Sequence, residues 1–436
     1  MSLEPRLQAL QSFLDSWTTA DGKLRGVVVT YWDQQLEPIE HVMHYYPLIL
    51  AYIRQHQAGR RFGAVEPLDA ARRMGDRLVS LQEASGLFGA AWGDIPPKRT
   101  GPVLQAAPAY ALARLYQVTG ETMYLDSAFR AYEKLKTDWW DGITLRNYVV
   151  NQTSTFVALL VALYQIEPSD RLRKEIDQNI AWILDQQRPN GGFPQAYHSL
   201  RMFLVYNAKS CIGLLAALES FSNTGYTSAV PEALRQQAHF LLNHLYYDAD
   251  GPMFVSHVEP VAYPYPLYLQ IYRAAKLLPK GRKIFYRICR NVPYTAVRRW
   301  PIWIARSALI IDVLHQIAEV LNDDTIRAGV RHTARTLLRK QYLNGAFPNA
   351  IGFRGNLQPT WYDVAAPVRW NVYAYLLLSD LCLDGVQIDL PEFLPEEAIT
   401  VPFMSKKRAF LWHEDRDHLI LRSATGNSVW QFEKRF

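Results

Sequence analysis

The sequence predicts an all-α fold, an (α/α)6 toroid in which six helical hairpins close into a ring. A dipeptide ending in glycine returns six times, with successive glycines 64, 56, 49, 60 and 94 residues apart. Each follows a helix-like stretch and precedes a short loop and a second, more apolar helix-like stretch. Recurrence on this scale is typical of repeat architectures. The dipeptides are Asp21-Gly22, Ser85-Gly86, Asp141-Gly142, Asn190-Gly191, Asp250-Gly251 and Asn344-Gly345.

Each hairpin is expected to consist of a first helix, a corner loop and a second helix. An Asp-Gly or Asn-Gly pair supplies the positive-φ residue that ends a helix. The expected helix pairs are 4–18 with 37–56, 67–84 with 102–119, 122–138 with 151–167, 168–187 with 202–222, 231–247 with 260–279, and 324–341 with 364–384.

The two helices of a pair differ in composition, which predicts two concentric layers. First helices show one apolar face; Leu172, Ile176 and Ile180 are spaced in this way behind Ser169, a good N-cap residue. Second helices are apolar on most sides, as in 158–163. A helix that is apolar all round is buried. We therefore expect the second helices to form the inner ring, with all six corner loops on one rim.

Two segments depart from this repeat. Residues 280–323 interleave basic and aromatic side chains and explain the long last interval as a helical insertion in a toroid that spans 1–397. Residues 398–436 contain short alternating runs separated by turn residues, so they predict a small antiparallel β extension.

Composition limits the location and the partners of the chain. It has 436 residues, of which 49% are hydrophobic, and a net charge of +6, a mild excess that suits an acidic partner. The acidic, amphipathic start is unlike a signal peptide, so we expect a cytoplasmic protein. The basic-aromatic segment 280–323 leaves peripheral membrane association open. No nucleic-acid motif accompanies it, so no nucleic-acid partner is expected.

The corner sequences resemble those of a known group of enzymes. The run 186–195, QQRPNGGFPQ, resembles an element of family-10 pectate lyases, and 341–349 and 82–89 are looser versions. Related turns occur in terpene cyclases and other α/α-toroid enzymes. The resemblance covers residues 1–390 and implies an (α/α)6 toroid and a carbohydrate-active enzyme.

Other chemistries of toroid enzymes lack their motifs here. The nearest match to a terpene-cyclase DxDD acid is 248–251, DADG, which lacks the last carboxylate. The three cysteines, Cys211, Cys289 and Cys382, form no zinc pattern. Phosphate-binding glycine motifs are absent. The sequence therefore predicts no cofactor and no metal.

Two groups of polar residues on the expected rim are candidates for catalysis. Glu37, His41 and His44 could share one helix face at the start of the first inner helix. In the fourth corner, Asn207 and Lys209 interrupt an apolar inner helix, which is costly unless they face a polar cavity. Each group can equally be structural: a capped helix start in the first case and satisfied buried polar groups in the second.

These observations favour an enzyme that acts on an acidic, uronate-containing poly- or oligosaccharide by lyase, epimerase or glycoside hydrolase chemistry. A terpene-cyclase-like enzyme and a non-catalytic scaffold or glycan-binding protein are the alternatives. The predicted catalytic residues are Glu37, His41, His198, Tyr206 and Asp363. The predicted glycan-binding residues are Trp32, Asp33, Trp92, Asp94, Arg99, Asn147, Tyr148, Gln195, Asn207, Lys209, His257, Arg354, Trp361 and Trp370.

Overall fold

We analysed a computed structural model of the chain. It describes residues 2–19, 21–29, 36–89, 101–195, 202–221, 229–248, 250–260, 270–271, 273–275, 277–278, 294–296, 302–351, 368–390, 393, 401–405, 408–414, 418–423 and 429–433.

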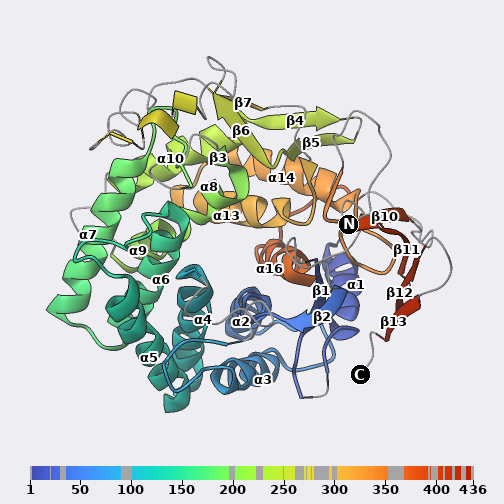
Figure 1. Ribbon diagram of the computed structural model, residues 1–436, viewed down its shortest axis with the longest axis horizontal. Helices are drawn as coiled ribbons and strands as arrows, with labels where there is room; N and C mark the ends of the chain where they lie inside the picture. The colour runs from blue at the N-terminus through green and yellow to red at the C-terminus, as the bar shows by residue number, and fades with distance from the viewer. Residues whose placement is uncertain are drawn as a thin grey trace.

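The described helices form two concentric rings, as the sequence predicts (Figure 1). Neighbours in the inner ring pack in the order α2, α4, α6, α8–α9, α13, α16 and back to α2. The inner helices are α2 (Val42–Gln57), α4 (Val103–Thr119), α6 (Val150–Ile166), α8 (Leu204–Lys209) with α9 (Ile212–Ser220), α13 (Ser307–Leu321) and α16 (Val368–Leu383). The outer helices are α1 (Glu4–Asp15), α3 (Pro67–Ser80), α5 (Thr122–Trp139), α7 (Asp170–Gln186), α10 (Ala229–Leu242) and α14 (Asp324–Leu338).

The inner and outer helices differ in how many of their sides are buried, as their composition predicts. In α6 every residue from Thr153 to Leu163 is buried. In α5 the buried residues follow one face, including Tyr124, Ala128 and Leu135. An inner helix therefore contributes side chains to the core on all sides, while an outer helix covers the core with one stripe.

The fifth pair differs from the expectation. Its inner helix is α13, Ser307–Leu321, and not 260–279; α13 packs on α14, α16 and α8. Residues 307–321, which we assigned to an insertion, thus belong to the ring, because their apolar residues match an inner helix. The long excursion lies between α10 and α13 and contains strands. They are β4 (Leu245–Asp248), β5 (Gly251–Phe254), β6 (His257–Pro260), β7 (Tyr294–Ala296) and β8 (Ile302–Trp303).

Short strands extend the corners of the ring. The first corner folds as a hairpin of β1 (Arg25–Val29) and β2 (Leu36–Glu40). Glu37 therefore lies on a strand and does not share a helix face with His41, contrary to our expectation, because α2 begins only at Val42. Strand β3 (Met202–Phe203) pairs with β6, which pairs with β7, and β9 (Ala350–Ile351) pairs with β8.

The C-terminal segment forms a four-stranded antiparallel sheet in sequential order. Its strands are β10 (Val401–Ser405), β11 (Arg408–Glu414), β12 (His418–Ser423) and β13 (Val429–Glu433). In Figure 1 this sheet lies at the edge of the ring, beyond α1. It therefore stands outside the two layers of helices.

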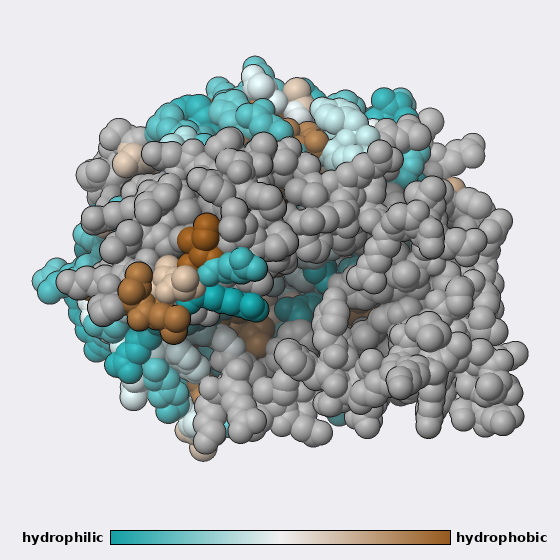
Figure 2. All heavy atoms as spheres, turned by 45° about the horizontal axis from the view of Figure 1, so that its top comes forward, coloured by the Kyte–Doolittle hydropathy of each residue, from teal (hydrophilic) through white to brown (hydrophobic). Residues whose placement is uncertain are grey.

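Apolar side chains reach the surface in a few places. Figure 2 shows brown, apolar side chains beside hydrophilic ones on the face that brings the top of Figure 1 forward. Near the end of the described excursion, Ile271, Leu277 and Leu278 are 41%, 85% and 64% exposed. Within the described residues, no helix combines the length and the apolar character needed to cross a membrane.

Candidate functional site

Three of the corners share one hydrogen-bond pattern, which joins each of them to an outer helix. In three corners a glutamine amide donates to the carbonyl of the corner glycine and to an outer-helix carbonyl. Gln187 Nε2 donates to Gly191 O at 2.9 Å and to Ala233 O at 2.8 Å. Gln82 makes the same two bonds to Gly86 and Ser127, and Gln341 makes them to Gly345 and Arg6.

A buried phenylalanine completes each of these corners. Its backbone N–H donates to an amide oxygen on the inner helix: Phe193 to Asn207 at 2.7 Å and Phe347 to Asn371 at 2.7 Å. Phe88 bonds Gln105 in the same way at 2.6 Å. The recurring Gln, Gly and Phe positions therefore have a structural role, because they join a corner to two helices. Asn207, a predicted glycan-binding residue, has its amide oxygen in this bond.

A cationic and aromatic group of side chains gathers at the corner end of the inner ring. We call it the rim cluster: His41, Lys209, Arg306, Arg369, Trp370 and Tyr373. Lys209 Nζ donates to Tyr373 Oη at 3.1 Å and lies 5.7 Å from the Trp370 ring centre. The guanidinium groups of Arg306 and Arg369 lie 4.6 Å and 5.4 Å from the same ring centre. Two guanidinium groups and an amine thus surround one indole, a geometry that favours a negatively charged or electron-rich ligand.

Burial sets the protonation state of Lys209. The side chain is only 5% exposed as a residue, and burial, with Arg369 and Arg306 adding repulsion, lowers the Lys209 pKa to about 7. Near neutral pH a large share of this amine is therefore uncharged. A neutral amine can accept a proton, which makes Lys209 a candidate base.

His41 is a neutral imidazole whose proton lies on one defined ring nitrogen. Burial, with help from the charge on Arg369, lowers the His41 pKa well below its usual value. Its Nδ1 accepts the Met43 backbone N–H at 3.0 Å and so caps α2. The proton of the neutral ring is therefore on Nε2. A neutral imidazole held in this way donates a hydrogen bond to an oxygen of a ligand without adding a charge.

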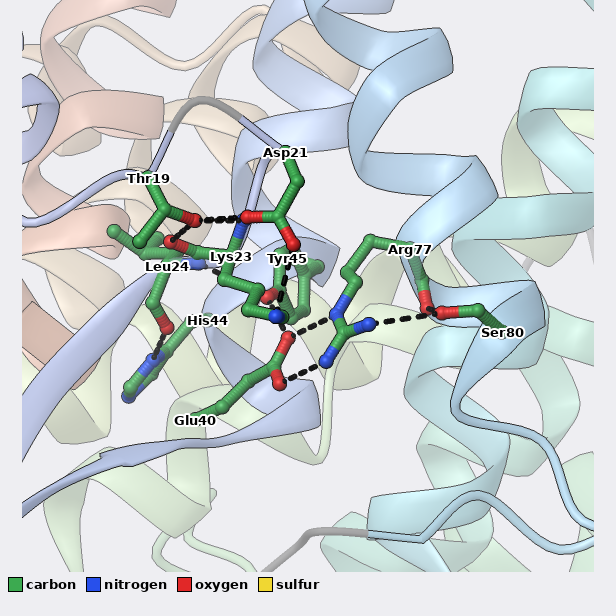
Figure 3. A network of polar contacts seen from close by, with 9 residues as sticks. All are labelled: Thr19, Asp21, Lys23, Leu24, Glu40, His44, Tyr45, Arg77 and Ser80. Carbon is green, nitrogen blue, oxygen red and sulfur yellow. Dashed lines mark hydrogen bonds and ion pairs between the residues drawn. The ribbon is translucent and has the colours of Figure 1, made fainter. Parts of the chain in front are cut away.

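Glu40, at the end of β2, has a structural role. Arg77 bonds both oxygens of Glu40, at 2.7 Å and 2.6 Å, and Tyr45 also donates to Glu40 (Figure 3). The Leu24 backbone N–H donates to Tyr45 Oη at 3.0 Å, and the Leu24 carbonyl bonds His44 Nδ1 at 3.1 Å. This network joins the first corner to α2 and α3. Glu40 is therefore held as a structural partner of Arg77.

Other predicted site residues lie at the same rim. His257 is 5% exposed; its Nδ1 bonds Ser256 Oγ at 2.7 Å and its ring lies 4.6 Å from Phe203. Tyr206 packs on Phe203 with ring centres 5.4 Å apart. In the third corner, the Asn147 side chain bonds Gln152 at 2.7 Å, Tyr148 is 37% exposed with a φ of 53°, and the Gln195 carbonyl accepts the Val150 N–H.

Several predicted residues fall outside the described part of the chain. They are His198, Asp363, Trp32, Asp33, Trp92, Asp94, Arg99, Arg354 and Trp361, and the side chain of Glu37. Conversely, Arg306, Arg369 and Tyr373 of the rim cluster were not predicted. Arg306 directly precedes α13, which the sequence analysis placed in an insertion. Correct placement of that helix would have brought Arg306 to the rim.

Among the described residues, no three His, Cys, Asp or Glu side chains come together in a way that could hold a metal ion. The rim cluster offers a base, hydrogen-bond donors, cations and an aromatic surface. Such groups can bind a sugar, stabilise an oxyanion and move a proton.

Known structures, but no known sequence family, are similar to this chain. No protein-family model matches the chain, and no curated protein sequence matches it. Solved structures do match it. A sugar epimerase from a ruminal bacterium superposes with a TM-score of 0.62 at 10% identity, over 89% of this chain and 100% of that one.

Two further structures are similar over nearly their whole length. Cellobiose 2-epimerase from Bacillus thermoamylovorans gives a TM-score of 0.60 at 12% identity, covering 88% of this chain and 99% of that one. An unsaturated glucuronyl hydrolase specific for heparin gives 0.57 at 13% identity, covering 89% and 99%. Together with the closed order of the inner helices, these matches confirm the α/α-toroid fold. They do not bear on the predicted resemblance to pectate lyases and terpene cyclases.

Proposed function

We propose that this protein is a carbohydrate-active enzyme that epimerises or isomerises a reducing sugar by proton transfer next to the carbonyl carbon. The observation that carries the proposal is Lys209, a buried amine with a pKa of about 7, set between two arginines and an indole. The fold shared with sugar epimerases supports the same reaction class.

In the proposed reaction, neutral Lys209 removes the proton from C2 of the open-chain sugar. The electrons of the C–H bond form the C1–C2 double bond, and the carbonyl oxygen becomes an enediolate oxygen. Arg306, Arg369 and His41 Nε2–H stabilise that negative charge. Return of a proton to the opposite face of C2, with the C1 carbonyl restored, gives the epimer. Return to C1, with transfer of the O2 proton to O1, gives the ketose. Tyr206 and His198 are the candidate acids for this second step.

The positive rim also supports a second candidate. A uronate carboxylate would be attracted by Arg306 and Arg369, and one structural neighbour is a glucuronyl hydrolase. Hydrolysis needs a pair of carboxyl groups across the sugar ring. Asp33, Glu37, Asp94 and Asp363, which the sequence analysis assigns to the corner loops or the start of the first inner helix, are the candidate carboxylates, and uronate lyase chemistry would instead use Lys209 with His198 or Tyr206.

The test is an assay in deuterium oxide. Cellobiose and mannose are incubated with the purified protein, and the C2 signals are followed by NMR. Epimerisation or isomerisation through an enediolate places deuterium on carbon, and Lys209→Met should slow this by at least about 100-fold. Absence of both deuterium exchange and new sugar from a panel of reducing sugars would overturn the proposal.

A parallel assay distinguishes the second candidate. An unsaturated uronyl disaccharide loses the ultraviolet absorbance of its double bond when it is hydrolysed. A loss of absorbance that depends on Asp33, Glu37, Asp94 or Asp363, and not on Lys209, would favour hydrolysis. New absorbance from a saturated polyuronate would instead favour lyase chemistry.

A further inference from the structure

A cavity lies at the end of the ring opposite the corners. Its volume is about 570 Å³, within the range of small-molecule sites. Its lining comes from α2, α4, α9, α13 and α16, and its mouth includes the exposed residues Gln57, Glu219 and Glu319 near the C-terminal ends of three of these helices.

Three tyrosines form the inner end of this cavity. Tyr46 lies 6.1 Å from Tyr110 and 6.4 Å from Tyr373, measured between ring centres, and all three line the cavity. Tyr373 also accepts the bond from Lys209 on the rim side. This tyrosine layer therefore marks the boundary between the rim cluster and the cavity. The two sites lie on opposite faces of one layer.

The cavity wall contains a pair of buried carboxyl groups. Asp312 and Asp380 are 4% and 5% exposed, and their side chains hydrogen-bond to each other. Asp312 Oδ2 accepts from Gln316 at 2.8 Å, and Asp380 Oδ2 accepts from Arg54. Burial and the neighbouring carboxylate raise the Asp312 pKa well above its usual range, so the pair shares a proton.

The other charges of the wall are close to balanced. Arg54 pairs with Asp380, His315 bonds Asp384 at 2.7 Å, and Glu319 pairs with Arg327. Arg114 and Glu219 both line the cavity, and no ion pair or hydrogen bond joins either of them to another described residue. The cavity thus offers many donors and acceptors with little net charge.

We propose that this cavity is a second binding site, for a neutral, polyhydroxylated molecule of the size of a mono- or disaccharide. Hydroxyl groups can donate to the carboxylate of Glu219, which lines the cavity at its exposed mouth. They can accept from Arg114. Leu215, Leu376 and the tyrosine layer supply apolar surface for the C–H faces of a sugar. The site stands on its own observations and does not depend on the proposed reaction.

The test uses the full chain and neutral probes. Glucose, cellobiose and mannitol are titrated by calorimetry into the wild-type protein, Ala216→Trp and Lys209→Met. Ala216 lines the cavity and takes no part in the rim cluster. We expect Ala216→Trp to abolish one binding event and to keep any activity, while Lys209→Met keeps that event. Loss of all probe binding on Lys209→Met, or unchanged binding by a folded Ala216→Trp protein, would overturn the proposal.

A milder variant keeps the test decisive if Ala216→Trp fails to fold. Arg114→Ala should weaken probe binding at the cavity about tenfold, equivalent to about 1.4 kcal/mol. Arg235→Ala, which removes an arginine on the outer face of α10, is the matched control and should have no effect. Equal affinity in both variants, or no binding of any probe to the wild-type protein, would overturn the site. Activity is measured separately in the deuterium assay, so the failure of one proposal can be distinguished from the failure of the other.

Discussion

At the scale of single residues, buried polar groups in apolar helices mark both sites. Lys209 could be singled out from sequence because a lysine inside an apolar inner helix needs a polar cavity or a partner. The same reasoning applies to Asp312 in α13 and Asp380 in α16, which the sequence analysis passed over as parts of apolar runs. Residue type alone could not reveal that these two carboxyl groups meet, because they lie on different helices.

Lys209 makes a specific prediction about pH. If the neutral amine is the base, the rate constant kcat/KM rises with pH and reaches a plateau above about 7, the Lys209 pKa. Lys209→Arg should show no such rise, because its guanidinium stays charged. Steady-state assays between pH 5 and 9 check this; a profile that is flat or falls through this range would contradict the assignment.

The same residue links activity to stability. Unfolded Lys209 returns to its ordinary pKa of 10.5, so between about pH 7 and 10 the unfolded chain binds more protons there than the folded chain. Its contribution therefore makes the free energy of unfolding rise with pH across that window. We expect Lys209→Met to remove this slope and to stabilise the protein at pH 7 by about 1–2 kcal/mol while abolishing activity. Urea unfolding at several pH values measures both effects.

Corner glycines test how the repeat is built. Gly142 and Gly191 both have positive φ, at 100° and 87°, but a Cβ on Gly142 would meet nothing within 4 Å, whereas one on Gly191 would lie 2.2 Å from the Gln236 carbonyl. Gly142→Ala should cost about 1–2 kcal/mol, from backbone strain alone. Gly191→Ala should cost clearly more, since α10 must also shift. Equal losses in thermal unfolding would show that the close approach is unimportant.

At the scale of elements, the glycine recurrence predicted the corners well. All six predicted corner glycines have positive φ. The fifth inner helix was misplaced because two apolar stretches, 260–279 and 307–321, compete for one position after α10. Periodicity alone cannot decide between them; packing on α16 and α8 does. The hairpin of β1 and β2 was missed because β1 lies in a corner that was interpreted as a loop and β2 overlaps the expected start of the first inner helix.

The excursion between α10 and α13 gives a prediction about membranes. Exposed Leu277 and Leu278 come directly before the basic and aromatic residues of 280–323. We expect the protein to sediment with vesicles that contain phosphatidylserine and not with neutral vesicles, and to be released by salt. Leu277→Ser with Leu278→Ser should weaken this severalfold. Leu343→Ser, at a leucine of 55% exposure elsewhere, is the control; equal effects would exclude this segment as the contact.

At the scale of the whole molecule, the sequence predicted the toroid and the common end of its corners, and the solved structures confirm the fold. It could not predict that buried polar groups gather on both sides of the tyrosine layer. The tyrosine layer that separates them is made by residues of α2, α4 and α16, and each tyrosine is typical of an ordinary core position. The layer forms only when the ring closes, and no local sequence pattern predicts which residues closure brings together.

That closure has a consequence for how the chain acquires its structure during synthesis. Helix α1 packs on α16, and Gln341 donates to the carbonyl of Arg6, 335 residues earlier in the chain. During translation α1 is therefore made several hundred residues before α16, and the face of α1 that carries Leu7 and Leu10 waits that long for this part of its packing. We expect chaperones to bind the nascent chain most strongly before α16 has left the ribosome.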